Sequence, residues 1–127
     1  MRLLLDTHTL IWSIDALPQL SLEAARLSAD RSNFLIASAF SLWELAIKVS
    51  IGKLTLSSSL PETIERIRSH RISWLPINHA HLLQLAELPL HHRDPFDRLL
   101  AAQAIVEGAT LLSADPAFDN YGVTRCW

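Results

Sequence analysis

The sequence has a single cysteine and no uncharged stretch long enough to cross a bilayer. Cys126 cannot form a disulfide within the chain, which favours a reducing compartment. The apolar start is interrupted by Asp6 and His8, and no small-residue cleavage site follows, so a secretory signal is not expected. These features predict a soluble cytoplasmic protein that does not contact the membrane.

Positive charge is also in short supply, with 11 lysines and arginines against 13 acidic residues and a net charge of −2. A protein that reads DNA sequence with high affinity usually carries a basic surplus. An enzyme whose bound cations and few local arginines contact phosphates remains compatible with this balance. With 127 residues, 50% of them hydrophobic and 19% charged, the chain fits one globular domain spanning residues 1–127.

Short apolar runs alternate with segments of helical spacing along the chain. The runs predict strands at residues 2–6, 34–37, 73–77, 109–113 and 123–127. The segments between them predict helices at residues 21–31, 38–52, 61–70, 79–87 and 94–107, with a further helix starting at Thr7. This alternation predicts an α/β domain with a mainly parallel sheet covered on both faces.

Helix ends are marked by residues of the expected kinds. The helix at 94–107 has Asp94 as its N-cap, Pro95 in the first turn and Gly108 as its stop. Either Ser38 or Ser41 is suited to cap the helix that runs through residue 52.

Four acidic residues occupy places that an ordinary core would not accept: Asp6, Glu44, Asp97 and Asp115. Asp6 and Asp115 follow strands, and the carboxyl edge of a parallel sheet is where ligands bind. Each acid also has a purely structural explanation. Asp6 and Asp115 suit N-cap positions, Glu44 can pair with Lys48 one turn on, and the helix dipole favours Asp97 in a first turn.

Together, the four carboxylates point to a metal site, because they would repel one another at one rim of the sheet. Mg²⁺ and Mn²⁺ prefer carboxylate and water oxygens, whereas the lack of cysteine and of suitably spaced histidines beside these acids argues against zinc. Cations held in this way can activate water and stabilise the leaving oxygen in phosphodiester hydrolysis.

Four segments in order, LLLDTHTLIW, SLWELAIKVSIGKL, HHRDPFDRLLAAQA and LLSADPAFDNYG, make the chain resemble the PIN-domain ribonucleases. It is most similar to the VapC-like toxins of bacterial type II toxin–antitoxin pairs. The resemblance extends from Met1 to about Tyr121, and HRDPFDRLLAAQA is its most specific segment. It implies a PIN-like three-layer α/β/α sandwich with a mainly parallel central sheet.

The resemblance also implies an activity and partners. The activity is Mg²⁺- or Mn²⁺-dependent endoribonuclease cleavage by a metal-activated water. Asp6, Glu44, Asp97 and Asp115 match the family's metal-site acids, and all four positions are acidic here. The implied partners are an RNA substrate, a cognate VapB-like antitoxin that inserts a segment into the active-site groove, and a second copy in a homodimer. DNA would be contacted only through the antitoxin.

Four further residues are candidates for substrate contacts: Thr7, Arg93, Arg98 and Ser113. The hydroxyl or backbone N–H of Thr7 could meet a phosphate at a helix start. The two arginines flank Asp97, where they could clamp phosphates or pair with a nearby acid. Ser113 could touch a phosphate or the metal shell, although a serine at a strand end needs no such role.

Other polar and aromatic residues receive weaker assignments. Lys48 and Lys53 are candidates for an RNA path, and His91-His92 is expected to be a loop pair rather than a metal site. The tryptophans at positions 12, 43 and 74 are expected in the core or an interface rather than as platforms on which bases stack. Trp43 and its neighbours are the best candidates for a surface buried by a dimer or an antitoxin.

Two alternatives remain open at this point. One is a PIN nuclease that acts in RNA processing or on structured DNA without an antitoxin. The other is a non-catalytic binding or regulatory module of a toxin–antitoxin complex. The intact set of four acids favours catalysis over the second alternative.

Overall fold

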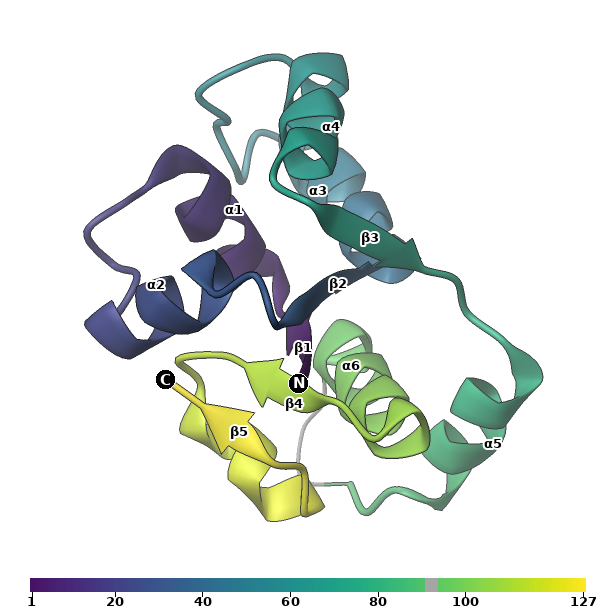
Figure 1. Cartoon of the computed structure of the whole chain (residues 1–127). Helices are drawn as coiled ribbons and strands as arrows, with labels where there is room; N and C mark the ends of the chain where they lie inside the picture. Colours follow the sequence, from purple (N-terminus) through teal and green to yellow (C-terminus); the bar gives the residue numbers. More distant parts are fainter. Residues whose placement is uncertain (91–93) are drawn as a thin grey trace.

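Parallel strands in the order β3-β2-β1-β4-β5 form the centre of this computed structural model, which describes residues 1–90 and 94–127 (Figure 1). The strands are β1 (Arg2–Leu5), β2 (Phe34–Ser38), β3 (Ile72–Leu75), β4 (Thr110–Leu112) and β5 (Arg125–Cys126). Every pairing between these strands is parallel. The predicted α/β class with a mainly parallel sheet is therefore confirmed.

Helices connect the strands. They are α1 (Thr7–Asp15), α2 (Leu22–Ala29), α3 (Ala39–Ser50), α4 (Leu60–Ser69), α5 (His79–Glu87), α6 (Pro95–Glu107) and the 3-10 helix η1 (Pro116–Tyr121). Of these, α1, α3, α6 and η1 begin at capping residues that the sequence indicated. Asp94 caps α6, and Gly108 ends it with a φ of +58°. Ser38, rather than Ser41, caps α3, because its hydroxyl accepts a hydrogen bond from the Phe40 backbone while Ser41 lies inside the helix.

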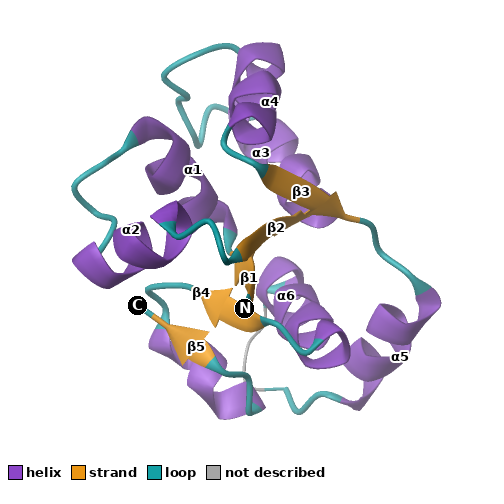
Figure 2. Ribbon diagram, in the orientation of Figure 1, coloured by secondary structure: helices purple, strands orange, loops and turns teal. Residues whose placement is uncertain are grey.

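Alternating residues of the strands bury two separate apolar layers. Leu3 and Leu5 of β1 pack with residues of α1, α2 and α4, whereas Leu4 packs on the opposite face with α5, α6 and η1. Figure 2 shows α1 and α2 on one side of the strands and α5 and α6 on the other. Full burial of each leucine contributes about 1.5–3 kcal/mol. The predicted three-layer α/β/α sandwich is confirmed.

A polar contact joins α5 to α6 beneath the apolar layer. The fully buried His81 ring places Nε2 2.8 Å from Oε1 of Glu107, and the Arg2 guanidinium lies 3.2 Å from the same carboxylate. These two hydrogen bonds, that of His81 first, hold the pKa of Glu107 below its ordinary value. None of the helices within residues 1–90 and 94–127 has the length and apolar character needed to cross a bilayer.

The strand order reverses beside β1, which defines where a ligand crevice belongs. From β1 the chain crosses to β2 on one side, while β4 enters from a later part of the chain on the other. In open parallel sheets, ligands bind beyond the carboxyl ends of the strands at such a switch point. The residues that follow β1 and β4 meet here, and the Asp6 backbone N–H donates to the Leu112 carbonyl at 3.3 Å.

Candidate active site

Asp6 lies between β1 and α1, and its two carboxylate oxygens accept hydrogen bonds from different partners. Its Oδ1 accepts a 2.7 Å hydrogen bond from the Thr9 backbone and so caps α1. Its Oδ2 accepts a short hydrogen bond from the Ser113 hydroxyl, which follows β4. The side chain is buried, at 7% exposure. The capping role and a place at the sheet edge are therefore compatible.

Glu44 is the buried acid of α3, and both of its oxygens are engaged. The Thr7 hydroxyl donates to Oε1 at 2.6 Å, and the Lys48 ammonium lies 2.6 Å from Oε2. Lys48 thus balances one charge of the acidic set from within the same helix, as the i,i+4 spacing predicted. The Thr7 contact links α1 to α3 and fixes Glu44 relative to Asp6.

Asp115 and Asp97 belong to later parts of the chain, at the start of η1 and of α6. Asp115 caps η1 by accepting a 2.9 Å hydrogen bond from the Ala117 backbone. Its own backbone N–H donates to the Ser113 hydroxyl at 3.1 Å, which extends the chain of contacts from Asp6. Asp97 lies in the first turn of α6. The structure supports the cap assignments for Asp6, Asp94 and Asp115.

A small pocket of about 100 Å³ brings these acids together. It is lined by Asp6, Thr7, His8, Glu44, Lys48, Asp94, Asp97, Asp115 and Phe118. The four acids selected from the sequence therefore share one pocket although they come from four different elements. The role of Asp94 as a cap does not prevent it from lining the same pocket, and Phe118 supplies an apolar wall.

The lining is of the chemical type that hard divalent cations prefer, with carboxylate and hydroxyl oxygens and no sulfur. As the side chains stand within residues 1–90 and 94–127, no three His, Cys, Asp or Glu residues converge closely enough to hold an ion. Mg²⁺ usually keeps several waters and takes one or two protein carboxylates. The pocket therefore fits such an ion by the chemistry of its donors rather than by a closed cage.

One of the predicted substrate contacts, Arg98, has hydrogen-bond partners elsewhere in the fold. Arg98 turns away from the pocket, and its Nη2 donates to the carbonyls of Leu85 and Leu88 at 3.3 and 3.2 Å. It fastens the end of α5 to α6, and the phosphate contact of Arg98 stays a prediction. The predicted contact of Arg93 and the His91-His92 pair lie outside the described residues.

Ser113 and Thr7 use their hydroxyls on acids of the pocket. Ser113 lies between Asp6 and the backbone of Asp115, and Thr7 holds Glu44. Their hydroxyls therefore orient carboxylates. A phosphate contact of Thr7 would then be made by the backbone N–H groups at the start of α1.

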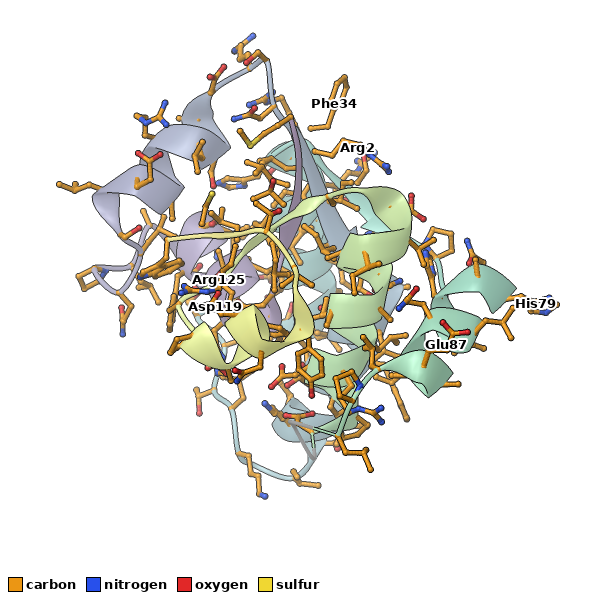
Figure 3. The ribbon with its side chains drawn as sticks, turned by 90° about the horizontal axis from the view of Figure 1, so that it is seen from below. Arg2, Phe34, His79, Glu87, Asp119 and Arg125 are labelled. Atoms are coloured by element: carbon orange, nitrogen blue, oxygen red, sulfur yellow. The ribbon has the colours of Figure 1, made fainter. Side chains whose placement is uncertain are left out.

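Arg125 is a supporting residue that sequence reasoning missed. Its Nη1 donates to the Ser113 carbonyl at 3.0 Å, and its Nε and Nη2 bind Asp119 at 2.8 and 2.9 Å (Figure 3). The hydrogen bond from Arg125 lowers the pKa of Asp119. The arginine thereby ties β5 and η1 to the strand end that carries Ser113. No motif marks it, since its role depends on the pairing of β5 with β4.

Comparison with known proteins agrees with this architecture. Solved structures with the same fold include VapBC2 from Rickettsia felis bound to a DNA fragment from their promoter (19% identity, TM-score 0.73, covering 99% of this chain and 98% of that chain). They also include VapBC-1 from nontypeable Haemophilus influenzae (21%, 0.69, 99% and 97%). FitAcB from Neisseria gonorrhoeae is a third (21%, 0.64, 97% and 95%).

No curated protein matches the chain by sequence alone. The profile of the PIN domain, in contrast, matches residues 3–123, which is nearly the whole chain and includes all four acids of the pocket. The match agrees with the parallel sheet, its switch point and the acidic pocket there. The chain belongs to the PIN domain family.

Proposed function

We propose that this protein is a Mg²⁺- or Mn²⁺-dependent endoribonuclease and the toxin of a VapBC-type toxin–antitoxin pair. The observation that carries the proposal is the pocket at the β1–β4 switch point, where four carboxylates from separate elements line one small space. Membership of the PIN domain family supports the nuclease assignment. The likeness in fold to VapBC and FitAB structures supports the assignment to a toxin–antitoxin pair.

Each residue of the pocket has a distinct part in this proposal. Asp6, Asp97 and Asp115 would hold the metal directly or through water, and Glu44 would ligate it or orient a metal-bound water. When bound, such an ion would lower the pKa of the attacking water and stabilise charge on the leaving oxygen. Thr7 and Ser113 keep Glu44 and Asp6 in place by the hydrogen bonds described above. Asp6 is held by two elements, β4 and α1, so little reorganisation is required of it during the reaction.

The proposed partners are a VapB-like antitoxin, which the likeness to VapBC and FitAB structures supports, and a second copy of this chain. A VapB-like antitoxin would occupy the groove at the acidic pocket, and DNA would be bound through that antitoxin. A homodimer is the expected form of the toxin. Trp43, which is 54% exposed and packs against Phe40 and Phe96, offers an apolar surface for one of these interfaces.

The decisive experiment measures RNA cleavage with Mg²⁺ or Mn²⁺, with and without a chelator. Wild type is compared with Asp6→Asn and with Asp30→Asn, the same substitution at an exposed acid outside the pocket. We expect cleavage by wild type and Asp30→Asn that the chelator abolishes, and no cleavage by Asp6→Asn. Normal cleavage by Asp6→Asn, or cleavage that survives the chelator, would refute the metal mechanism.

A further inference from the structure

A second pocket opens directly beside the acidic one, between α1 and the end of α3. It measures about 260 Å³ and is lined mainly by apolar atoms, with Ile11 and Leu54 among the residues that form it. It shares Thr7, His8 and Lys48 with the acidic pocket. A strand of substrate that places a phosphate over the carboxylates would therefore have an adjoining group at the mouth of this second pocket.

The α1 wall of this pocket is aromatic. His8 and Trp12 are one helical turn apart, and their rings stack with centroids 5.7 Å apart and an angle of 27° between their planes. The ring of Trp127 also packs against Trp12, with centroids 5.7 Å apart and an angle of 57° between the two planes. His8 is exposed and Trp12 is partly exposed, so the pair is a supported aromatic face rather than part of the closed core.

The opposite wall carries the positive charge. The chain has only two lysines, Lys48 and Lys53, and both line this pocket. The ammonium of Lys48 lies on the boundary between the pockets, where it pairs with Glu44. In a protein of net charge −2, this placement gives a polyanion a local cationic path that the overall composition does not provide.

We propose that this second pocket is a nucleobase subsite, in which a base of single-stranded RNA next to the cleaved bond stacks on His8 and Trp12. Lys53 would attract the adjoining phosphates, while Lys48, paired with Glu44, lies at the boundary between the two pockets. The inference rests on the proposed function and adds to it a contact with one base, which must leave its stack to enter the pocket. Aromatic stacking combined with lysines is the arrangement by which proteins bind single strands without reading a fixed sequence. A purely apolar peptide side chain would use the same aromatic wall but would gain nothing from the two lysines.

The test compares binding of fluorescein-labelled oligoadenylate with binding of an abasic ribose-phosphate oligomer of equal length. Measurements use the Asp6→Asn background with Mg²⁺, so that strands are bound without being cut. We expect oligoadenylate to bind about 5- to 150-fold more tightly than the abasic strand, the range measured for one stacked base. Trp12→Leu and His8→Ala should reduce this preference, whereas Trp12→Phe should retain it.

Charge and stacking are separated by two further variants. Lys53→Gln should weaken the binding of oligoadenylate and of the abasic oligomer by the same factor and make both affinities less dependent on salt. Phe34→Leu is the matched aromatic control, since Phe34 is 72% exposed at the amino end of β2 and is not among the residues that line the second pocket. It should change neither affinity. Loss of secondary structure in Trp12→Leu would leave His8→Ala, at an exposed position, to decide the outcome.

Two results would overturn the subsite. Equal binding of the two strands by the unmodified background, or a preference unchanged in both Trp12→Leu and His8→Ala, would show that no base occupies the pocket. The second result is the one expected if a peptide is the natural occupant. Metal-dependent RNA cleavage by wild type would still stand in either case, so failure of the subsite is distinct from failure of the nuclease.

Discussion

Replacing one carboxylate oxygen of Asp6 by an amide nitrogen separates the contribution of this residue to stability from its proposed role in catalysis. In Asp6→Asn, the amide oxygen can still accept from the Thr9 backbone, and the amide nitrogen can donate to the Ser113 hydroxyl after that hydroxyl rotates. We expect a change in the free energy of unfolding within about 1 kcal/mol. Asp6→Ala loses the helix cap, about 1 kcal/mol, and leaves buried partners unpaired, about 1–3 kcal/mol. We therefore expect Asp6→Ala to destabilise the fold by about 2–4 kcal/mol.

Urea unfolding with a chelator present, followed by the fluorescence of the four tryptophans, measures both variants without a metal contribution. Asp30→Asn serves as the control for an Asp-to-Asn change at an exposed turn, where the carboxylate accepts hydrogen bonds from Ser32. Equal destabilisation by Asp6→Asn and Asp6→Ala would contradict the reasoning. It would mean that the negative charge of Asp6, rather than its two acceptor positions, holds α1 to β4.

Three further substitutions test other contacts. Thr7→Val should lower the free energy of unfolding in urea by about 1–3 kcal/mol and reduce RNA cleavage, because Glu44 loses the hydroxyl that donates to it at 2.6 Å. Thr7→Ser should restore the stability and the cleavage. Full RNA cleavage by Thr7→Val would refute the positioning role of Thr7. Glu107→Gln should cost about 1–2 kcal/mol at neutral pH. Because the folded-state pKa of Glu107 is lowered, its contribution to the free energy of unfolding is complete above the ordinary pKa of 4.5 and is lost as the pH falls below it. The unfolding free energies of variant and wild type should therefore converge in acid. A difference in unfolding free energy that stays constant with pH would contradict this explanation. Gly108→Ala should lower stability by about 1 kcal/mol through its φ of +58° alone, as no neighbouring atom would be touched, and an unchanged unfolding midpoint would refute it.

Local signals in the sequence predicted most of the fold. Capping residues and spacing located α5 at residues 79–87 and α6 after Asp94, and apolar runs located every strand to within a few residues. These features depend on neighbours in the chain, which a sequence displays directly. The terminal strand was expected at 123–127 but covers only Arg125–Cys126, because β4 offers it only Leu111 and Leu112 as partners.

Contacts between distant elements were beyond the reach of sequence patterns. The position of Arg98 beside Asp97 suggested the acidic pocket, yet neighbours on a helix point in different directions, and Arg98 faces α5. Arg125 was overlooked for the converse reason, since its partners Ser113 and Asp119 become its neighbours only when β5 pairs with β4. Sequence reasoning selected the four acids because their chemistry was out of place, and it named Thr7 and Ser113 as candidate substrate contacts rather than as the donors that orient Glu44 and Asp6.

The two explanations offered for Glu44, an ion pair with Lys48 or a place in a metal site, do not exclude one another. An ionised carboxylate has about four lone-pair positions on its two oxygens, and Thr7 and Lys48 use one on each. Each oxygen therefore keeps acceptor capacity, and Glu44 is one of the residues that line the acidic pocket. Because an isolated buried charge is far more costly than a paired one, Lys48 and Thr7 explain how α3 tolerates a glutamate at 5% exposure in an otherwise apolar segment. The contacts that make Glu44 acceptable to the fold are thus the same contacts that hold it in position for the proposed reaction.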